Sequence, residues 1–251
     1  MLYLMGLGLS IEGISQEALE IVKRCKKIYL ENYTVDFPYS REELAHKINK
    51  KILPADREFI ESEEIVDEAE NMDVALLIYG SPLTATTHIS LINECKRLKV
   101  GYRVIYSASI LDAVAETGLQ LYKFGKITSM PKWDEKKNFT PDSFMEIVKE
   151  NQSINAHSLI LIDIGLEFED ALKELKISAE KNNIKLGKII LCQTLGTKTN
   201  KIFYSSTERF SEFNSVRKPY CIIIPGKLHF LEKEMLSNFE LDNVSLEKKH
   251  K

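Results

Sequence analysis

A chain of 251 residues, 44% hydrophobic and 28% charged, has the composition of a folded globular protein with room for one large or two modest domains. Its formal net charge of −3 lacks the basic excess of a nucleic-acid-binding domain, so we expect no nucleic-acid partner. No apolar run approaches the roughly 20 residues that cross a bilayer, and the first residues lack the features of a signal peptide. We therefore expect a cytoplasmic protein that does not bind membranes.

The first half of the chain alternates short apolar runs with amphipathic stretches, the pattern of an α/β protein. Strands are predicted at residues 2–7, 27–30, 73–79 and 104–106, with helices between them. Ser40 and Glu43 form a capping-box pattern that predicts the start of one helix. The third strand is apolar after its first residue, which indicates a central strand covered on both faces.

The second half repeats this alternation, with strands predicted at 159–162, 188–192, 201–205 and 220–224. We expect the third of these to be an antiparallel neighbour and the last to close the sheet. Residues 127–139 look like a connection between two halves, and Thr140 is expected to cap a helix with Pro141 in its first turn. The resulting domains are 1–112 and 113–251, the second ending in a solvated basic tail at 248–251.

Four cysteines offer no metal or disulfide pattern. They are far apart and form no CxxC pair, and Cys192 and Cys221 lie in strongly apolar runs. This spacing indicates reduced core thiols, so no metal site is expected.

Glycines and small hydroxyl residues gather where the predicted strands end. In open α/β sheets, ligands bind beyond the carboxyl ends of the strands. Each loop is also compatible with a plain turn or helix cap, and the Gly-x-Gly of residues 6–8 lacks the third glycine of a dinucleotide fingerprint, because Ile11 occupies that place. Their shared location favours a binding site, formed by residues 6–9, 80–88, 107–110, 194–197 and 225–229.

The composition of these loops limits the chemistry. No G-x-S-x-G, P-loop or H-E-x-x-H sequence is present. A site built from backbone, hydroxyl and aliphatic groups suits a neutral or cationic cofactor whose own bond supplies the reaction.

Five segments together resemble the diphthine synthase branch of the tetrapyrrole methylase superfamily. They occur in the family's order from residue 1 to about residue 232, and their combination is specific, although each alone is not: LYLMGLGL (2–9), LTATTH (83–88), ASI (108–110), GLQLYKFG (118–125) and PGKLH (225–229). The resemblance implies an α/β fold of two α/β domains with the cofactor cleft between them, in a homodimer.

The resemblance also implies a function, that of an S-adenosyl-L-methionine-dependent N-methyltransferase of diphthamide biosynthesis. Its protein substrate is translation elongation factor 2, where it methylates the amino group of 2-(3-amino-3-carboxypropyl)histidine and releases S-adenosyl-L-homocysteine. The alternatives are a tetrapyrrole-precursor methyltransferase and a non-catalytic S-adenosylmethionine-binding protein. The number of methyl groups, and whether a carboxylate is also methylated, stay open.

Cofactor-binding residues follow from the family's motifs. In the first domain they are Leu9, Ser81, Thr84, Ser109 and Ile110; in the second they are Ile162, Leu195 and His229. The family usually has aspartate at the position of Ser81, and serine offers hydrogen bonds but no charge to a sulfonium. This departure implies weaker binding, compensation elsewhere or lost catalysis.

The methyl-accepting amine must lose its proton before each attack, but no general base can be identified. Glu31, Asp163 and His229 are candidates, and we expect none to be essential because water can accept the proton. Aromatic side chains could also contact the cationic product. The candidates for that contact are Tyr33, Tyr122 and Trp133, for each of which core packing is the alternative.

Overall fold

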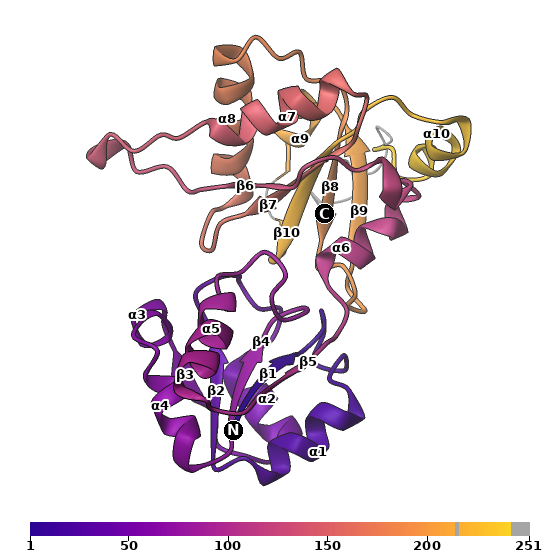
Figure 1. Cartoon of the computed structure of the whole chain (residues 1–251). Helices are drawn as coiled ribbons and strands as arrows, with labels where there is room; N and C mark the ends of the chain where they lie inside the picture. The colour runs from indigo at the N-terminus through magenta and orange to yellow at the C-terminus, as the bar shows by residue number, and fades with distance from the viewer. Residues whose placement is uncertain (214–215, 242–251) are drawn as a thin grey trace. The chain divides into compact units, whose positions relative to one another are not determined.

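The computed structural model describes residues 1–213 and 216–241, which form two compact units, one of residues 1–113 and one that begins at Val114 (Figure 1). Each unit contains one five-stranded sheet with helices packed against it. The predicted α/β fold is confirmed, since each unit has its own sheet and helices. The basic tail at 248–251 lies outside the described residues. Within the described ranges, no helix has both the length and the apolar composition needed to span a membrane.

Unit 1 is built on a parallel sheet with the strand order β3-β2-β4-β1-β5. All residues of the central β4 are buried, as its apolar sequence predicts. The strands are β1 (Leu2–Gly6), β2 (Lys27–Glu31), β3 (Leu53–Ala55), β4 (Val74–Ile78) and β5 (Tyr102–Ile105).

Helices cover both faces of this sheet, because alternate residues of β1 belong to two different hydrophobic cores. Leu2 and Leu4 pack in one core, and Tyr3 and Met5 pack in the other. The predicted capping box at Ser40 is present. The helices are α1 (Gln16–Arg24), α2 (Arg41–Ile48), α3 (Arg57–Glu61), α4 (Glu64–Asn71), α5 (Ile89–Leu98) and α6 (Ile110–Ala113).

Unit 2 contains a mixed sheet with the order β6-β7-β10-β8-β9. Only β6 and β7 are parallel; the other neighbours are antiparallel, including the predicted pair β8 and β9. The strands are β6 (Thr128–Met130), β7 (Ser158–Ile162), β8 (Ile189–Gln193), β9 (Lys201–Ser205) and β10 (Tyr220–Ile224). The helices are α7 (Ser143–Ser153), α8 (Phe168–Lys181), α9 (Thr207–Phe210) and α10 (Phe230–Ser237), with 3₁₀ turns at Val114–Thr117, Leu121–Lys123 and Glu135–Lys137.

Two predictions about the sheet of unit 2 are wrong. The strand at 220–224 does not close the sheet but lies between β7 and β8, where its apolar side chains are buried on both faces. The half-exposed β9 takes the edge instead. Residues 127–139 are not simply a connection, because Thr128–Met130 pairs with β7 as the opposite edge strand.

The start of α7 also differs from the prediction. Asp142, not Thr140, precedes the helix. Trp133 Nε1 donates to the carbonyl of Pro141 at 3.0 Å, and Asn182 Nδ2 donates to Asp142 Oδ2 at 3.1 Å. These tertiary hydrogen bonds hold Pro141 outside the helix, so helix propensity alone does not decide where the helix begins.

Candidate cofactor site and a second polar cluster

The loops that follow β1, β4 and β5 leave unit 1 at the same edge, since these three parallel strands are neighbours. The connection from β1 to β2 packs on one face of the sheet, and the connection from β4 to β5 packs on the opposite face. Loops diverge at such a point and leave a crevice at the carboxyl ends of the strands. This edge is therefore where the topology favours a ligand.

Two glycines join the first two loops. The backbone N–H of Gly8 donates to the carbonyl of Gly80 and that of Gly80 to the carbonyl of Gly8, both at 3.0 Å. Both residues have positive φ, +68° and +72°, which glycine adopts without steric cost. The hydroxyl of Tyr79 donates to the carbonyl of Leu9 at 3.0 Å and fixes the chain beyond Gly8.

Gly6 lies at the contact point of all three loops. A Cβ atom on Gly6 would lie 2.6 Å from the carbonyl oxygen of Gly80 and 2.9 Å from the Cβ of Ser107. Such distances are too short for any side chain. Glycine at this position is thus what allows the three loops to approach one another.

The loop after β4 is tightly folded and carries two of the predicted cofactor residues, Ser81 and Thr84. Leu83 and Ala85 have positive φ values of 65° and 54°, an uncommon conformation for residues with a side chain. The side chains of Ser81 and Thr84 are half-buried. The hydroxyl of Thr86 is buried and has no hydrogen-bond partner among the described residues.

The loop after β5 places Ser109 at the start of α6. The hydroxyl of Ser109 accepts a hydrogen bond from the N–H of Leu111 at 3.1 Å, and its own N–H donates to Asp112 Oδ2 at 2.8 Å. Asp112 is therefore committed to this turn. Ile110 is half-buried beside it.

Five predicted cofactor residues are thus brought to one edge of the sheet of unit 1: Leu9, Ser81, Thr84, Ser109 and Ile110. Their side chains are aliphatic or carry hydroxyls, and none carries a positive charge. This set of groups fits the neutral and cationic parts of S-adenosylmethionine.

Glu31, Tyr33 and His88 form a cluster that joins the end of β2 to the loop after β4, a grouping that the sequence did not predict. Glu31 and His88 are both 0% exposed. The hydroxyl of Tyr33 lies 3.3 Å from His88 Nε2. His88 was visible in the sequence only as the last letter of a motif, because a lone histidine does not reveal its neighbours.

The three predicted cofactor residues of unit 2 do not share one edge of its sheet. Ile162 ends β7 and Leu195 follows β8, and these two strands run in the same direction. His229 follows β10, which runs antiparallel to both, with Ile224 opposite Ser158 at the start of β7. Ile224, the last residue of β10, therefore lies beside the first residue of β7, whereas Ile162 is the last residue of β7. Since a five-residue strand is about 16 Å long, about that distance separates Ile162 from the point where the chain leaves β10 towards His229.

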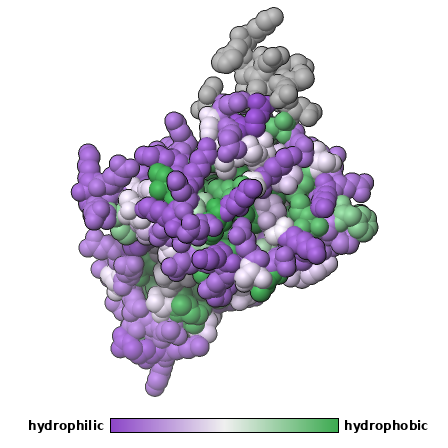
Figure 2. All heavy atoms as spheres, turned by 90° about the horizontal axis from the view of Figure 1, so that it is seen from above, coloured by the Kyte–Doolittle hydropathy of each residue, from purple (hydrophilic) through white to green (hydrophobic). Residues whose placement is uncertain are grey.

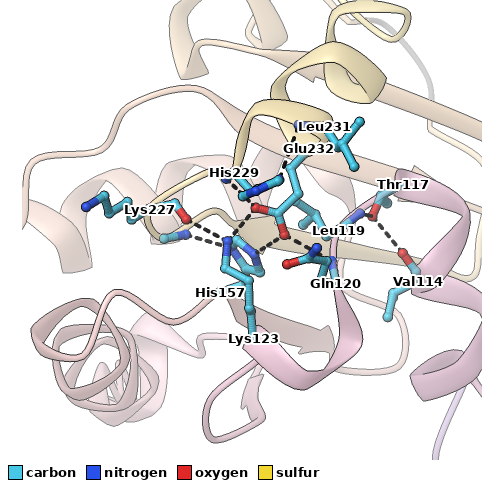
Figure 3. A network of polar contacts seen from close by, with 11 residues as sticks. Val114, Thr117, Leu119, Gln120, Lys123, His157, Lys227, His229, Leu231 and Glu232 are labelled. Carbon is cyan, nitrogen blue, oxygen red and sulfur yellow. Dashed lines mark hydrogen bonds and ion pairs between the residues drawn. The ribbon is translucent and has the colours of Figure 1, made fainter.

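His229 caps α10 in a cluster centred on the buried Glu232 (Figure 3). Its backbone N–H donates to Glu232 Oε2 at 2.7 Å, and its Nδ1 accepts from the N–H of Leu231 at 3.4 Å. Glu232 also forms an ion pair with Lys123 and accepts from the N–H of Gln120 at 3.0 Å. The GLQLYKFG and PGKLH segments are therefore joined by one carboxylate.

His157 completes this cluster. Its Nδ1 accepts from the N–H of Gly226 at 2.9 Å, so the proton is on Nε2, which lies 3.1 Å from Glu232 Oε1. Burial lowers the pKa of His157, while Glu232 opposes that change. Burial also disfavours ionised Glu232, yet hydrogen bonds from Lys123, His229, Gln120 and His157 hold its pKa at about 2. The cluster is thus an ionised carboxylate paired with Lys123 beside a neutral histidine.

The remaining candidates have varied surroundings. Asp163 is exposed and accepts from the N–H of Lys132 at 3.1 Å. Tyr122 is 81% exposed, whereas Trp133 is half-buried under the ammonium of Lys181. All four cysteines are buried and free of disulfides. In the part of the chain that the structure describes, no three His, Cys, Asp or Glu side chains form a group that could hold a metal.

Comparison with known proteins gives consistent matches. The model of the family Tetrapyrrole (Corrin/Porphyrin) Methylases matches residues 1–210. The diphthine methyl ester synthase of Bos taurus is 36% identical over an alignment of 280 positions, which covers 98% of each chain. The Schizosaccharomyces pombe protein of that name is 44% identical over 170 residues, which span 66% of this chain and 59% of the relative. Among solved structures, a putative diphthine synthase from Entamoeba histolytica matches with a TM-score of 0.86 and 27% identity, covering 96% of this chain and 99% of that one.

Proposed function

The chain belongs to the tetrapyrrole methylase family, in its diphthine synthase branch, and from this membership we infer that it is a methyltransferase of diphthamide biosynthesis. Its protein substrate is translation elongation factor 2, in the cytoplasm. The observation that carries the proposal is the convergence of three strand-end loops at Gly6 and Gly80. The relatives that cover nearly the whole chain are diphthine methyl ester synthases, which favours this function over a tetrapyrrole-precursor methyltransferase.

S-adenosyl-L-methionine is the proposed methyl donor, and when bound it supplies an activated methyl group on a sulfonium. Leu9, Ser81, Thr84, Ser109 and Ile110 hold it at the edge of unit 1. Their aliphatic and hydroxyl groups bind and orient it without repelling its positive charge. Ile162, Leu195 and His229 stay proposed contacts from unit 2.

The accepting atoms are proposed to be of two kinds. The amino group of 2-(3-amino-3-carboxypropyl)histidine is the acceptor implied by the family. The relatives' name specifies a methyl ester, whose formation requires a carboxylate acceptor. We therefore propose that this chain methylates both the amine and the carboxylate of the same side chain. The two groups differ in one respect, since a carboxylate is already deprotonated at neutral pH and an aliphatic amine is not.

A homodimer is proposed for the assembled enzyme. Apolar side chains reach the surface among hydrophilic ones (Figure 2), and in unit 2 Tyr122, Ile154 and Phe230 are 81%, 70% and 67% exposed. Tyr122 and Ile154 line one open pocket together with Leu228, and exposed apolar surface of this kind favours association. Light scattering of the purified chain tests this part of the proposal, and a mass of one chain at micromolar concentration would contradict it.

An acceptor comparison tests the function itself. The chain is incubated with labelled S-adenosylmethionine and either elongation factor 2 carrying the aminocarboxypropyl-histidine or a tetrapyrrole precursor. We expect label in the protein alone. Transfer to the tetrapyrrole would support the alternative methyltransferase. Binding of S-adenosylhomocysteine without transfer to either acceptor would support a non-catalytic binding protein.

A further inference from the structure

Unit 1 contains two fully buried side chains that can carry charge near neutral pH, Glu31 and His88. Glu31 is the last residue of β2, and His88 lies at the end of the loop that follows β4. Because β2 and β4 are neighbouring parallel strands, both residues lie at the edge that carries the cofactor loops. Burying such groups is costly unless they are hydrogen-bonded. Their place at this edge therefore calls for a reason beyond packing.

Glu31 is a fixed carboxylate rather than a free base. Its Oε1 accepts from the N–H groups of Tyr33 and Thr34 at 2.9 and 2.8 Å, and its Oε2 accepts from the hydroxyl of Thr34 at 2.7 Å. These hydrogen bonds fold the loop after β2 around the carboxylate. They also set the position of Tyr33.

Tyr33 links this loop to the loop after β4. Its hydroxyl lies 3.3 Å from His88 Nε2, and the two rings meet edge to face with centroids 6.3 Å apart. The residue is only half-buried, whereas His88 is not exposed at all. Tyr33 is thus the more exposed member of this pair.

His88 is held in the neutral form, the form of imidazole that can accept a proton. Burial lowers its pKa, and the negative charge of Glu31 partly offsets this, so the ring is neutral at pH 7. Its Nδ1 has no hydrogen-bond partner among the described residues. A neutral imidazole with its proton on Nδ1 leaves Nε2 free to accept a proton from the hydroxyl of Tyr33.

We propose that Tyr33 and His88 form a two-residue proton relay for the methyl-accepting amine, with Glu31 as the positioning residue. The inference rests on the proposed function, since it concerns the acceptor of that same reaction. The loop after β2 lies next to the loop that carries Ser81 and Thr84, on the side away from β1. An acceptor placed beside the cofactor loops on that side meets the hydroxyl of Tyr33.

The relay moves one proton for each methyl group added to nitrogen. An N–H proton of the substrate ammonium passes to the hydroxyl oxygen of Tyr33 as the hydroxyl proton passes to His88 Nε2. The products are a neutral amine, a neutral tyrosine and an imidazolium that the negative charge of Glu31 favours. The amine lone pair then forms the new N–C bond, while the electrons of the C–S bond leave with sulfur. His88 returns its proton through Tyr33 to water after each transfer.

The surroundings of Tyr33 favour its protonated form, which a relay requires and a tyrosinate base does not. Burial and the charges of Glu31 and Glu61 raise the pKa of Tyr33, and the guanidinium of Arg57, 5.4 Å from the ring centroid, and a hydrogen bond from Thr87 oppose them. Tyr33 therefore stays protonated near neutral pH and passes a proton on without losing its own.

The test compares the two kinds of acceptor in the full-length chain. Tyr33→Phe removes the hydroxyl, and His88→Gln keeps a hydrogen-bonding group that cannot accept a proton. His46→Gln on the exposed face of α2 is the matched control. Amine and ester methylation are followed separately by mass spectrometry from pH 7 to 9, and affinity for S-adenosylhomocysteine is measured by calorimetry.

We expect both relay variants to slow amine methylation roughly 100-fold at pH 7, the usual contribution of a general base. The loss should shrink towards pH 9, where more of the substrate ammonium loses its proton to solvent without the relay. Ester formation and S-adenosylhomocysteine affinity should stay near those of His46→Gln. Equal losses for amine and ester, or a loss independent of pH, would overturn the relay and leave a structural role. A wild-type chain that methylates neither group would instead reject the proposed function.

An NMR titration gives a readout independent of activity. The ¹⁵N shifts of His88 should report a neutral ring protonated on Nδ1 at pH 7. A ring protonated on Nε2 throughout the titration would contradict the relay, since that atom could not then accept the proton of Tyr33.

Discussion

The backbone groups of Gly8 and Gly80 exchange two hydrogen bonds of 3.0 Å, and this pair ties the loop after β1 to the loop after β4. Both glycines have positive φ. Because the strands β1 and β4 are also hydrogen-bonded neighbours, the pair extends their contact beyond the sheet. The pair therefore fixes these two loops to each other at the edge where the predicted cofactor residues lie.

Gly6→Ala tests the convergence of these loops. The new Cβ would lie 2.6 Å from the carbonyl oxygen of Gly80, so the loop after β4 must move. We expect at least about a tenfold weaker affinity for S-adenosylhomocysteine, or about 1.4 kcal/mol, measured by calorimetry. Gly187→Ala is the control, because nothing lies within 4 Å of its Cβ position. Unchanged affinity in Gly6→Ala would mean that the cofactor binds elsewhere.

Ser81→Asp tests the consequence of the missing aspartate. A carboxylate in the loop after β4 should favour the cationic S-adenosylmethionine over the neutral S-adenosylhomocysteine. Because Ser81 is half-buried, we expect a gain of about 1 kcal/mol, or roughly fivefold, in the ratio of the two affinities. Ser81→Asn is the uncharged control. If both variants change the two affinities alike, residue 81 does not lie near the sulfonium.

Glu232→Gln tests the buried cluster of unit 2. The change leaves Lys123 without its ion pair and weakens the hydrogen bonds from Gln120 and His229. We expect a loss of about 2 to 4 kcal/mol in the free energy of unfolding. This is somewhat less than breaking a fully buried ion pair costs, because Lys123 is partly exposed to solvent. Glu234→Gln on the same helix is exposed and should change stability little. Equal stabilities of the two variants in urea would show that the cluster does not hold the fold.

The free energy of unfolding should decrease as the pH is lowered, because two buried histidines and one buried carboxylate all resist protonation in the folded chain. The folded chain holds His88 and His157 neutral with lowered pKa values, so the unfolded chain binds more protons below pH 6.5. The pKa of Glu232, about 2 when folded against 4.5, adds stability that is lost as the pH falls from about 4.5 towards 2. Urea unfolding at pH 7.5, 6 and 4.5 should show a steady decrease. A stability that is flat over this range would contradict the neutral buried histidines.

Sequence patterns predicted most strands because each buried strand is a continuous apolar run. β4 and β7 were predicted within two residues of their observed bounds, and the capping box at Ser40 was recognised. β3 was missed because it is three residues long, contains Pro54 and gains its stability from pairing with β2. The central place of β10 was missed for a related reason, since strand order depends on long-range pairing that local patterns do not encode.

Only part of the candidate site could likewise be predicted from the sequence. Leu9, Ser81, Thr84, Ser109 and Ile110 could be placed together because they follow neighbouring strand ends. The partners of His88 and His229 could not be predicted. Tyr33 lies 55 positions before its partner His88, and Glu232 looks like an ordinary residue on an amphipathic helix until its burial is known. Contacts between buried polar groups are settled by packing rather than by spacing along the chain.

The most direct test of the central claim is a tandem mass spectrum of the histidine-containing peptide of elongation factor 2 after incubation with the chain and deuterated-methyl S-adenosylmethionine. The account predicts deuterated methyl groups on both the amine and the carboxylate of the aminocarboxypropyl side chain. An unlabelled peptide, from a chain that still binds S-adenosylhomocysteine, would contradict the proposed reaction and leave only a cofactor-binding fold.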